Sequence, residues 1–147
     1  MFCPDSELSA ADHRLIASAL ELLDRCARPG RHEVAAALRT RSGGIYLGLH
    51  VESSIGRASI CAEGVAIGVA AAAGDTEIET IVAVLRTEDG GWRVVSPCGL
   101  CRELISDYAT DAQVIDYDGA RPGDPVAKVT VRALLPGKTA RRWQGAS

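Results

Sequence analysis

This chain of 147 residues has few aromatic residues and a net charge close to zero. Phe, Trp and Tyr together make up 4% of the sequence, and the formal net charge at pH 7 is only −3. Proteins that bind a nucleic-acid backbone normally carry a basic surface, and single-strand binders also need aromatic side chains on which bases stack. We therefore expect no nucleic-acid polymer as a partner.

Long apolar runs are lacking as well. The longest, Val65–Ala73, contains Gly68 and is much shorter than the roughly 18 residues of a membrane span. Residues 1–8 show neither the basic region nor the apolar region of a secretory signal. Apolar residues are 47% and charged residues 24%, which is ordinary for a globular protein. These features predict one domain over residues 1–147, no membrane partner and a cytoplasmic location.

Hydrophobic periodicity predicts alternating helices and strands. A capping-box pattern at Ser9–Asp12 predicts a helix that ends before Pro29-Gly30, and Ser42–Gly44 predicts the turn of a strand hairpin. The remaining predicted elements are helices at Cys61–Ala73, Cys98–Tyr108 and Val131–Leu135, and extended segments at Ile78–Leu85, Trp92–Val95, Gln113–Tyr117 and Ala127–Val129. This order indicates an α/β fold with a mixed sheet between helices.

Five cysteines are present, and their odd number makes a disulfide framework the weaker interpretation. Three of them lie in two short segments, Cys61-Ala62-Glu63 and Pro97-Cys98-Gly99-Leu100-Cys101-Arg102, each at the start of a predicted helix. Free N–H groups at a helix N-terminus favour thiolate over thiol. Three protein ligands and one open position are typical of a catalytic zinc site.

The neighbouring residues suit such a site. Glu63 follows Cys61 by two residues, so its carboxylate can accept and deliver protons beside the metal without binding it. Arg102 follows the last ligand and could hydrogen-bond a thiolate, which would offset the negative charge of the site. Three alternatives remain at this point: buried apolar cysteines, a redox pair at Cys98 and Cys101, or a structural zinc site completed by Cys3, Cys26 or His50.

The same motif is the signature of zinc-dependent nucleobase deaminases. The segments Val34–Leu38, Leu47–Gly68 and Val94–Ala109 resemble the small homo-oligomeric cytidine deaminases, and within that superfamily the bacterial blasticidin-S deaminases most closely. The resemblance implies a cytidine deaminase-like three-layer α-β-α fold with a five-stranded mixed sheet. It also implies a homo-oligomer, expected to be a tetramer, with one zinc ion per chain.

The resemblance further implies hydrolytic conversion of the 4-amino group of a cytosine nucleoside to a 4-oxo group, with release of ammonia. Carried over to this sequence, Cys61, Cys98 and Cys101 would bind zinc and Glu63 would move protons. The backbone of Ala62 and Ser96 would contact the cytosine ring.

One departure bears on the substrate. Cytidine deaminases carry an Asn-x-Glu segment that holds the ribose hydroxyls, whereas this chain has His50-Val51-Glu52, followed by Ile55-Gly56-Arg57. The bacterial blasticidin-S type resembles this chain at both places. We therefore expect a blasticidin-S-type pocket in which His50 and Glu52 contact the substrate. Cytidine or deoxycytidine of pyrimidine salvage, or another modified pyrimidine, are the alternative substrates.

Two more residues are candidates for the edge of the pocket. Arg57 is expected either to contact substrate or to form an ion pair between subunits. Trp143, in the basic C-terminal tail, is a candidate for closing the site of a neighbouring subunit. A different functional class, a non-enzymatic zinc or redox domain, would place no demand on Glu63.

Overall fold

The computed structural model describes residues 8–117 and 125–139. In chain order its elements are α1 (Ala10–Cys26), β1 (Val34–Thr40), β2 (Ile45–Leu49), the 3-10 turn η1 (Gly56–Ala58), α2 (Ala62–Ala72), β3 (Ile78–Arg86), β4 (Trp92–Val94), α3 (Gly99–Tyr108), β5 (Gln113–Tyr117), β6 (Val126–Thr130) and α4 (Val131–Leu134). Across these ranges, no helix combines the length and the apolar character needed to cross a membrane.

The strands form one mixed sheet. Its order is β2-β1-β3-β5-β6, and a sixth strand, β4, pairs with β3 outside this path. Strand β1 runs antiparallel to β2 and β3, whereas β5 is parallel to β3. The predicted mixed sheet is thus confirmed. Its strand number rises from five to six, because the short segment Trp92–Val94 forms a ladder with Val84–Arg86.

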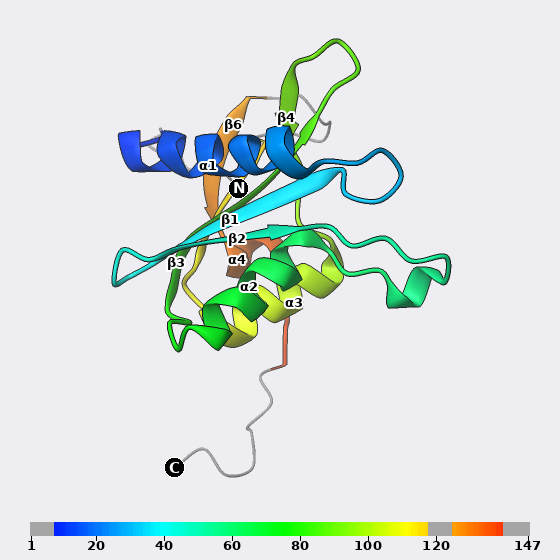
Figure 1. Ribbon diagram of the computed structural model, residues 1–147. Helices are drawn as coiled ribbons and strands as arrows, with labels where there is room; N and C mark the ends of the chain where they lie inside the picture. Colours follow the sequence, from blue (N-terminus) through cyan, green and yellow to red (C-terminus); the bar gives the residue numbers. More distant parts are fainter. Residues whose placement is uncertain (1–7, 118–124, 140–147) are drawn as a thin grey trace.

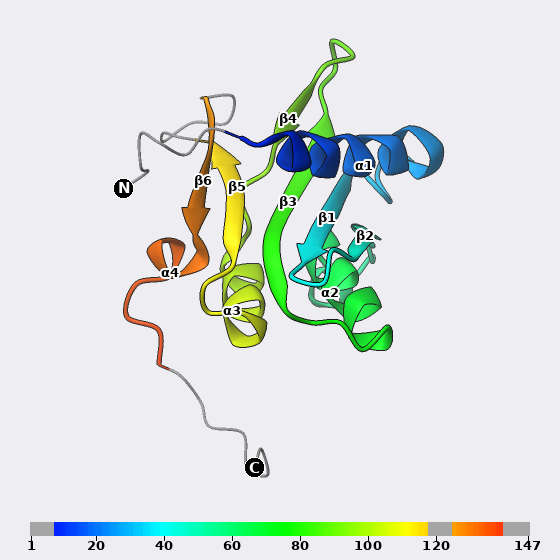
Figure 2. The same ribbon diagram turned by 90° about the vertical axis from the view of Figure 1, so that its left-hand side faces the viewer.

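Helices cover both faces of the sheet, which confirms the three-layer α-β-α architecture. Figures 1 and 2 show α1 across one face and α2 and α3 across the other. Alternate residues of the central strands point into two separate cores. The core under α1 includes Ala35, Ala37, Val82, Val84 and Ile115. The core under α2 and α3 includes Ala36, Leu38, Ile81, Ala83 and Val114.

The first turn of α1 contains a buried carboxylate. The predicted capping box is present: Asp12 accepts a hydrogen bond from the Ser9 backbone, and the Asp12 N–H donates to the Ser9 hydroxyl. The fully buried Asp12 side chain also pairs with Arg39 Nη2 at 3.0 Å and with Lys128 Nζ at 2.9 Å. Because Arg39 lies on β1 and Lys128 on β6, this carboxylate connects the helix to strands on both sides of β3.

Helix α2 packs against β2 at a position that has room only for glycine. A Cβ atom on Gly48 would lie 2.4 Å from the Ala66 nitrogen and 2.5 Å from the Ala62 oxygen. The first turn of α2 therefore rests on the strand backbone itself. At its other end the helix stops before Gly74, whose φ of +72° is the left-handed conformation of a helix C-cap.

Candidate active site

The strand register brings the two cysteine segments to one place on the sheet. Gly48 of β2, Ala36 of β1 and Ala83 of β3 form one row across three strands. The first turn of α2 sits on Gly48, and the Val95 N–H, just before α3, donates to the Ala83 carbonyl at 2.8 Å. Both helix N-termini therefore lie over the same row, whose residues have small side chains or none.

Three thiols meet at these helix N-termini. Cys61 and Cys98 precede α2 and α3 as their N-cap residues, and Cys101 lies in the first turn of α3. The sulfur atoms of Cys61 and Cys98 are 3.5 Å apart, and all three sulfur atoms lie within 4.8 Å of one another. Cys98 is exposed, Cys61 half-buried and Cys101 buried, so the cluster is open on one side.

The geometry and the type of donor atoms fit zinc. Zinc–sulfur bonds of about 2.3 Å in a tetrahedral site separate the sulfur atoms by roughly 3.8 Å, which lies within the observed range. Thiolates are donors that zinc accepts well, and three of them leave one position for a reacting molecule. No disulfide involves the cysteines in the part of the chain that the structure describes, so all three thiols are available as ligands.

The electrostatics of the thiols also point to a cation. Burial raises the pKa of the Cys61 thiol, and the neighbouring Cys98 sulfur raises it further. Burial, with the negative charges of Glu63 and the other thiols, likewise raises the pKa of Cys101. For Cys98, burial opposes ionisation, but the backbone N–H groups of Cys101 and Leu100 favour the thiolate and the net pKa is lowered. A bound divalent cation would favour the thiolate forms, against both the burial and the neighbouring negative charges that raise these two pKa values.

Glu63 occupies the second position of α2, beside Cys101. Its side chain is buried, with a relative exposure of 5%, and burial raises the pKa of its carboxyl group. The side chains that surround it in the interior are largely apolar and include Ile81, Ala83, Val95 and Pro97. The structure thus brings Glu63 to the cysteine cluster, as the sequence spacing predicts.

His50 and Glu52 form a pair just beyond the end of β2. His50 Nε2 is 2.7 Å from Glu52 Oε2, and the Ser59 hydroxyl donates to Glu52 Oε1 at 3.0 Å. Hydrogen bonds from Ser59 and His50 lower the pKa of Glu52. Val51 and Ile60 form a two-way backbone bridge, which places the pair next to the chain segment that enters Cys61.

The two ring nitrogens of His50, Nε2 and Nδ1, have different surroundings. A carboxylate accepts hydrogen bonds, so Nε2 must carry the proton that it shares with Glu52. Nδ1 is buried and has no hydrogen-bond partner within the described ranges. An asparagine at this position would present an amide instead. The chemistry at the end of β2 therefore differs from that of an Asn-x-Glu segment.

Arg102 supports the loop that carries Cys98. Its guanidinium group donates to the Pro97 carbonyl at 2.8 Å, to the Leu134 carbonyl at 3.0 Å and to the Ser96 hydroxyl at 3.2 Å. All of its hydrogen bonds within residues 8–117 and 125–139 thus go to oxygen atoms. The predicted hydrogen bond to a thiolate is not among them, because the side chain reaches back along the loop instead.

Within the residues that the structure describes, no contact tests the roles predicted for Ala62, Arg57 and Trp143. Ala62 is buried in the first turn of α2, next to Cys61. Arg57 is exposed in η1 and has no ion pair within the described ranges. Trp143 lies outside the described residues. Sequence reasoning missed Asp116, a buried residue of β5 that accepts a hydrogen bond from Ser96. A lone aspartate within a predicted strand gave no signal of this contact.

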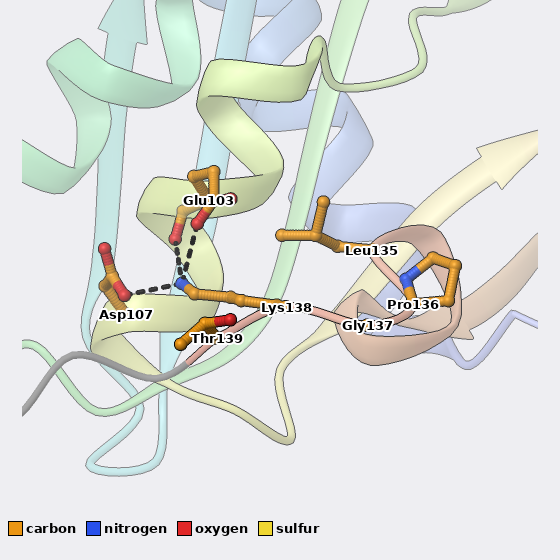
Figure 3. Close-up of a pocket in the computed structure, with 7 residues that line it drawn as sticks. All are labelled: Glu103, Asp107, Leu135, Pro136, Gly137, Lys138 and Thr139. Carbon is orange, nitrogen blue, oxygen red and sulfur yellow. Dashed lines mark hydrogen bonds and ion pairs between the residues drawn. The ribbon is translucent and has the colours of Figure 1, made fainter.

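A wider cavity of about 620 Å³ lies between α3 and the segment that follows α4, and none of the described residues that line it is a cysteine. Figure 3 shows Lys138 bonded there to Glu103 and Asp107. The ammonium group also contacts the Ser106 hydroxyl. The ammonium group is already paired with two carboxylates, so this cavity is a less suitable reaction site than the cysteine cluster.

Comparison with known proteins identifies the family. Residues 9–116 match the model of the cytidine and deoxycytidylate deaminase zinc-binding region. The chain is 42% identical over 139 residues to a blasticidin-S deaminase of Bacillus cereus, covering 91% of this chain and 96% of that protein. It is 33% identical over 108 residues to a cytidine deaminase of Halalkalibacterium halodurans, covering 73% and 76% of the two chains.

A solved structure agrees with these matches. The crystal structure of a cytidine deaminase from Burkholderia pseudomallei superposes with a TM-score of 0.70 at 27% identity, covering 90% of this chain and all of that one. Of the functional classes that the cysteine spacing left open, these relatives favour an enzyme over a non-catalytic zinc or redox domain. The chain belongs to the cytidine and deoxycytidylate deaminase family and is a zinc-dependent deaminase.

Proposed function

We propose that this enzyme deaminates a free cytosine nucleoside held in a blasticidin-S-type pocket, and that blasticidin S is its substrate. The observation that carries the proposal is the His50–Glu52 pair beyond β2, where the resemblance to cytidine deaminases calls for Asn-x-Glu. The 42% identity with a blasticidin-S deaminase over nearly the whole chain supports it. Cytidine or deoxycytidine is the alternative, because relatives named cytidine deaminase reach 33% identity.

In this proposal Cys61, Cys98 and Cys101 hold the zinc ion. Bound zinc supplies a nucleophile at neutral pH by acidifying a water molecule. The three cysteines come from two helix N-termini whose backbone N–H groups favour the thiolate form. The overall reaction adds one water to the cytosine ring and releases one ammonia, leaving a uracil ring.

Glu63 is proposed to move the protons. Its carboxylate lies beside the thiols but is not one of the three ligands, so it can take up a proton and deliver it to the departing amino group. Its buried position keeps bulk water from competing for that proton. The backbone of Ala62 and Ser96 is proposed to contact the edge of the ring, which would orient the amino group toward Glu63.

The His50–Glu52 pair is proposed to contact the sugar or the group attached to it. Glu52 already accepts hydrogen bonds from Ser59 and His50, so its orientation is fixed before substrate binds. The carboxylate retains lone pairs for a substrate donor. Arg57 and Trp143 are proposed to lie at the edge of the pocket, on the substrate or on a neighbouring subunit.

The remaining properties of the molecule are also proposals. We infer one domain over residues 1–147, because the described elements share a single sheet. We infer a homo-oligomer, a tetramer, as the resemblance implies. A cytoplasmic location agrees with cysteines that are free thiols throughout the described part of the chain.

The first experiment pairs metal content with turnover. Purified protein is analysed for zinc per chain, and ammonia release with the change in cytosine absorbance is followed on cytidine, deoxycytidine and blasticidin S. The proposal expects one zinc per chain and turnover of blasticidin S in preference to the other two. Preferential turnover of cytidine would overturn the substrate assignment. Zinc without turnover of any of the three would point to another modified pyrimidine.

His50→Asn tests the observation on which the substrate proposal depends. The variant replaces an imidazole with the amide expected in a cytidine pocket. We expect the ratio of kcat/KM for blasticidin S to that for cytidine to fall by about tenfold, a difference of about 1.4 kcal/mol in transition-state binding. Steady-state kinetics on both substrates measures the ratio. An unchanged ratio would remove His50 from substrate selection.

A further inference from the structure

Asp116 is a buried carboxylate that the reaction scheme above does not use. It lies in β5 with a relative exposure of 2%. One oxygen, Oδ2, accepts a hydrogen bond from the Ser96 hydroxyl at 2.7 Å, and the other, Oδ1, accepts from the Tyr117 N–H at 2.8 Å. A buried carboxylate is retained only where it is well bonded, so its partners indicate what it holds in place.

Its main long-range partner is the loop that delivers a metal ligand. The Ser96 hydroxyl donates to Asp116 and accepts from Arg102 Nη2, so it connects β5 to α3. Arg102 Nε holds the next carbonyl, that of Pro97. Cys98 follows directly. The network therefore runs from a strand of the sheet, through one hydroxyl, to a helix that carries two of the thiols.

Secondary structure alone does not hold this loop. The last strand bond before it is from the Val95 N–H to the Ala83 carbonyl, and the first helix bond after it is from the Arg102 N–H to the Cys98 carbonyl. Between the two, no hydrogen bond within the described ranges engages the Ser96 backbone. Side chains must therefore fix Ser96, whose backbone is proposed to face the substrate ring.

We propose that Asp116 is a positioning residue for the deamination reaction, acting through the Ser96 hydroxyl. Asp116 fixes the Ser96 backbone, which is proposed to contact the substrate ring, and the Cys98 thiol, which is proposed to bind the metal. Asp116 itself contacts neither the substrate nor the metal. This inference rests on the proposed roles of Ser96 and Cys98. It also assigns a reason for a serine, rather than another small residue, before Pro97.

A double-mutant cycle tests the connection. Asp116→Asn keeps the shape of the side chain but leaves one oxygen for two donors, and Ser96→Ala removes the hydroxyl. We expect each single variant to lower kcat/KM by about tenfold on the best of the three substrates above. Because both changes break one connection, the double variant should lose no more than a single variant. Losses that multiply in the double variant would overturn the proposal.

Metal release gives a second readout that does not depend on turnover. Zinc-loaded protein is mixed with a coloured chelator, and the rate of zinc transfer is recorded. A loosened loop should release zinc about tenfold faster in Asp116→Asn and in Ser96→Ala, with no further increase in the double variant. Ser96→Ala also keeps the proposal testable if Asp116→Asn folds poorly.

Asp75→Asn is the matched control. Asp75 also accepts hydrogen bonds from hydroxyl groups, those of Thr40, Ser42 and Tyr46, but it follows the C-terminal end of α2, opposite Cys61. It should leave zinc release and kcat/KM close to those of the unmodified enzyme. Equal effects of Asp75→Asn and Asp116→Asn would indicate general destabilisation and overturn the proposal. An inactive unmodified enzyme would instead count against the proposed function.

Discussion

At Glu63, a role in proton transfer can be tested separately from zinc binding. Glu63→Gln keeps the size of the side chain and removes its ability to carry a proton. We expect zinc content to stay at that of the unmodified enzyme and kcat to fall by about 10²-fold or more, because general acid–base catalysis contributes on that scale. Metal analysis and steady-state kinetics on the same preparation measure both quantities.

Glu103→Gln is a suitable comparison for that variant. Glu103 is an exposed carboxylate on α3 that pairs with Lys138 at 3.0 Å. Its amide variant should keep both zinc and turnover. If Glu63→Gln retained turnover, or lost its zinc, the proton-transfer role proposed for Glu63 would be wrong.

Asp12 makes the stability of the protein depend on acid. Burial opposes its ionisation, but bonds from Ser9, Lys128 and Arg39 outweigh burial and lower its pKa from 3.8 to about 2. The charged form is therefore favoured by folding, and its contribution is complete above pH 4 and lost as the pH falls toward 2. Asp12→Asn should lower the free energy of unfolding by about 3 kcal/mol near neutral pH, since it removes the buried negative charge that pairs with both Lys128 and Arg39.

Denaturant unfolding between pH 7 and pH 2 checks this prediction. The difference between the two proteins should be constant near neutrality and should shrink below pH 4. Glu79→Gln serves as the comparison, because Glu79 pairs with the same Arg39 but is 46% exposed. Exposed ion pairs contribute about 1 kcal/mol or less, so this change should have little effect. A difference that does not vary with pH would show that Asp12 acts by packing alone.

At the scale of the element, the contact between β2 and α2 sets the positions of Cys61 and Glu63. Gly48→Ala would place a Cβ atom 2.4 Å from the Ala66 backbone, so the helix must move. We expect the free energy of unfolding to fall by about 1–3 kcal/mol. Zinc content should fall as well, because Cys61 and Glu63 move with α2 while Cys98 and Cys101 stay on α3.

A glycine on the helix itself provides the contrast. Gly68 lies in α2, and a Cβ atom added there would meet none of the described residues within 4 Å beyond its own stretch of helix. Gly68→Ala should raise stability by up to about 1 kcal/mol, as glycine is a poor helix former. Thermal unfolding with zinc analysis distinguishes the two. A Gly48→Ala protein as stable as the unmodified one would contradict the close approach of strand and helix.

Local patterns predicted most of these elements. The strand at Gln113–Tyr117 has the predicted bounds, and the helix after Cys61 begins within one residue of its predicted start. Strand β4 was predicted only as an extended segment, because three residues carry too little periodicity to show pairing. The contact of Gly48 with α2 was not predicted, since glycine has no side chain through which a pattern could indicate it.

The contacts of the candidate site likewise include some that the sequence predicted and some that it did not. The three cysteines and Glu63 lie in two short motifs, and their meeting was predicted because together these motifs resemble the signature of zinc-dependent deaminases. The partners of Arg102 lie at Pro97, Ser96 and Leu134, and the last of these is 32 residues away. Asp116 is 20 residues from Ser96. Contacts over such separations depend on the sheet order, which local patterns do not specify.

At the scale of the whole molecule, the outward face of α2 offers a place to test the proposed tetramer. Val69, on that face, is 44% exposed. If copies of the chain associate through α2, Val69→Asp places a charge in the interface. We expect sedimentation to show a species of roughly four times the 15.4 kDa chain for the unmodified protein and a smaller one for the variant. Trp92→Gln, on β4, should leave the mass unchanged, and a monomeric unmodified protein would refute the tetramer.

The turn between β3 and β4 separates the metal ligands along the chain. It extends away from α2 and α3 (Figure 1), and Gly90 within it has a φ of +83°. A break between Asp89 and Gly90 would leave Cys61 and Glu63 on one fragment, and Cys98 and Cys101 on the other. Neither fragment alone would hold all three cysteines of the cluster. Deamination would then report the meeting of two separately produced fragments, which is the requirement for a split-enzyme sensor of protein association.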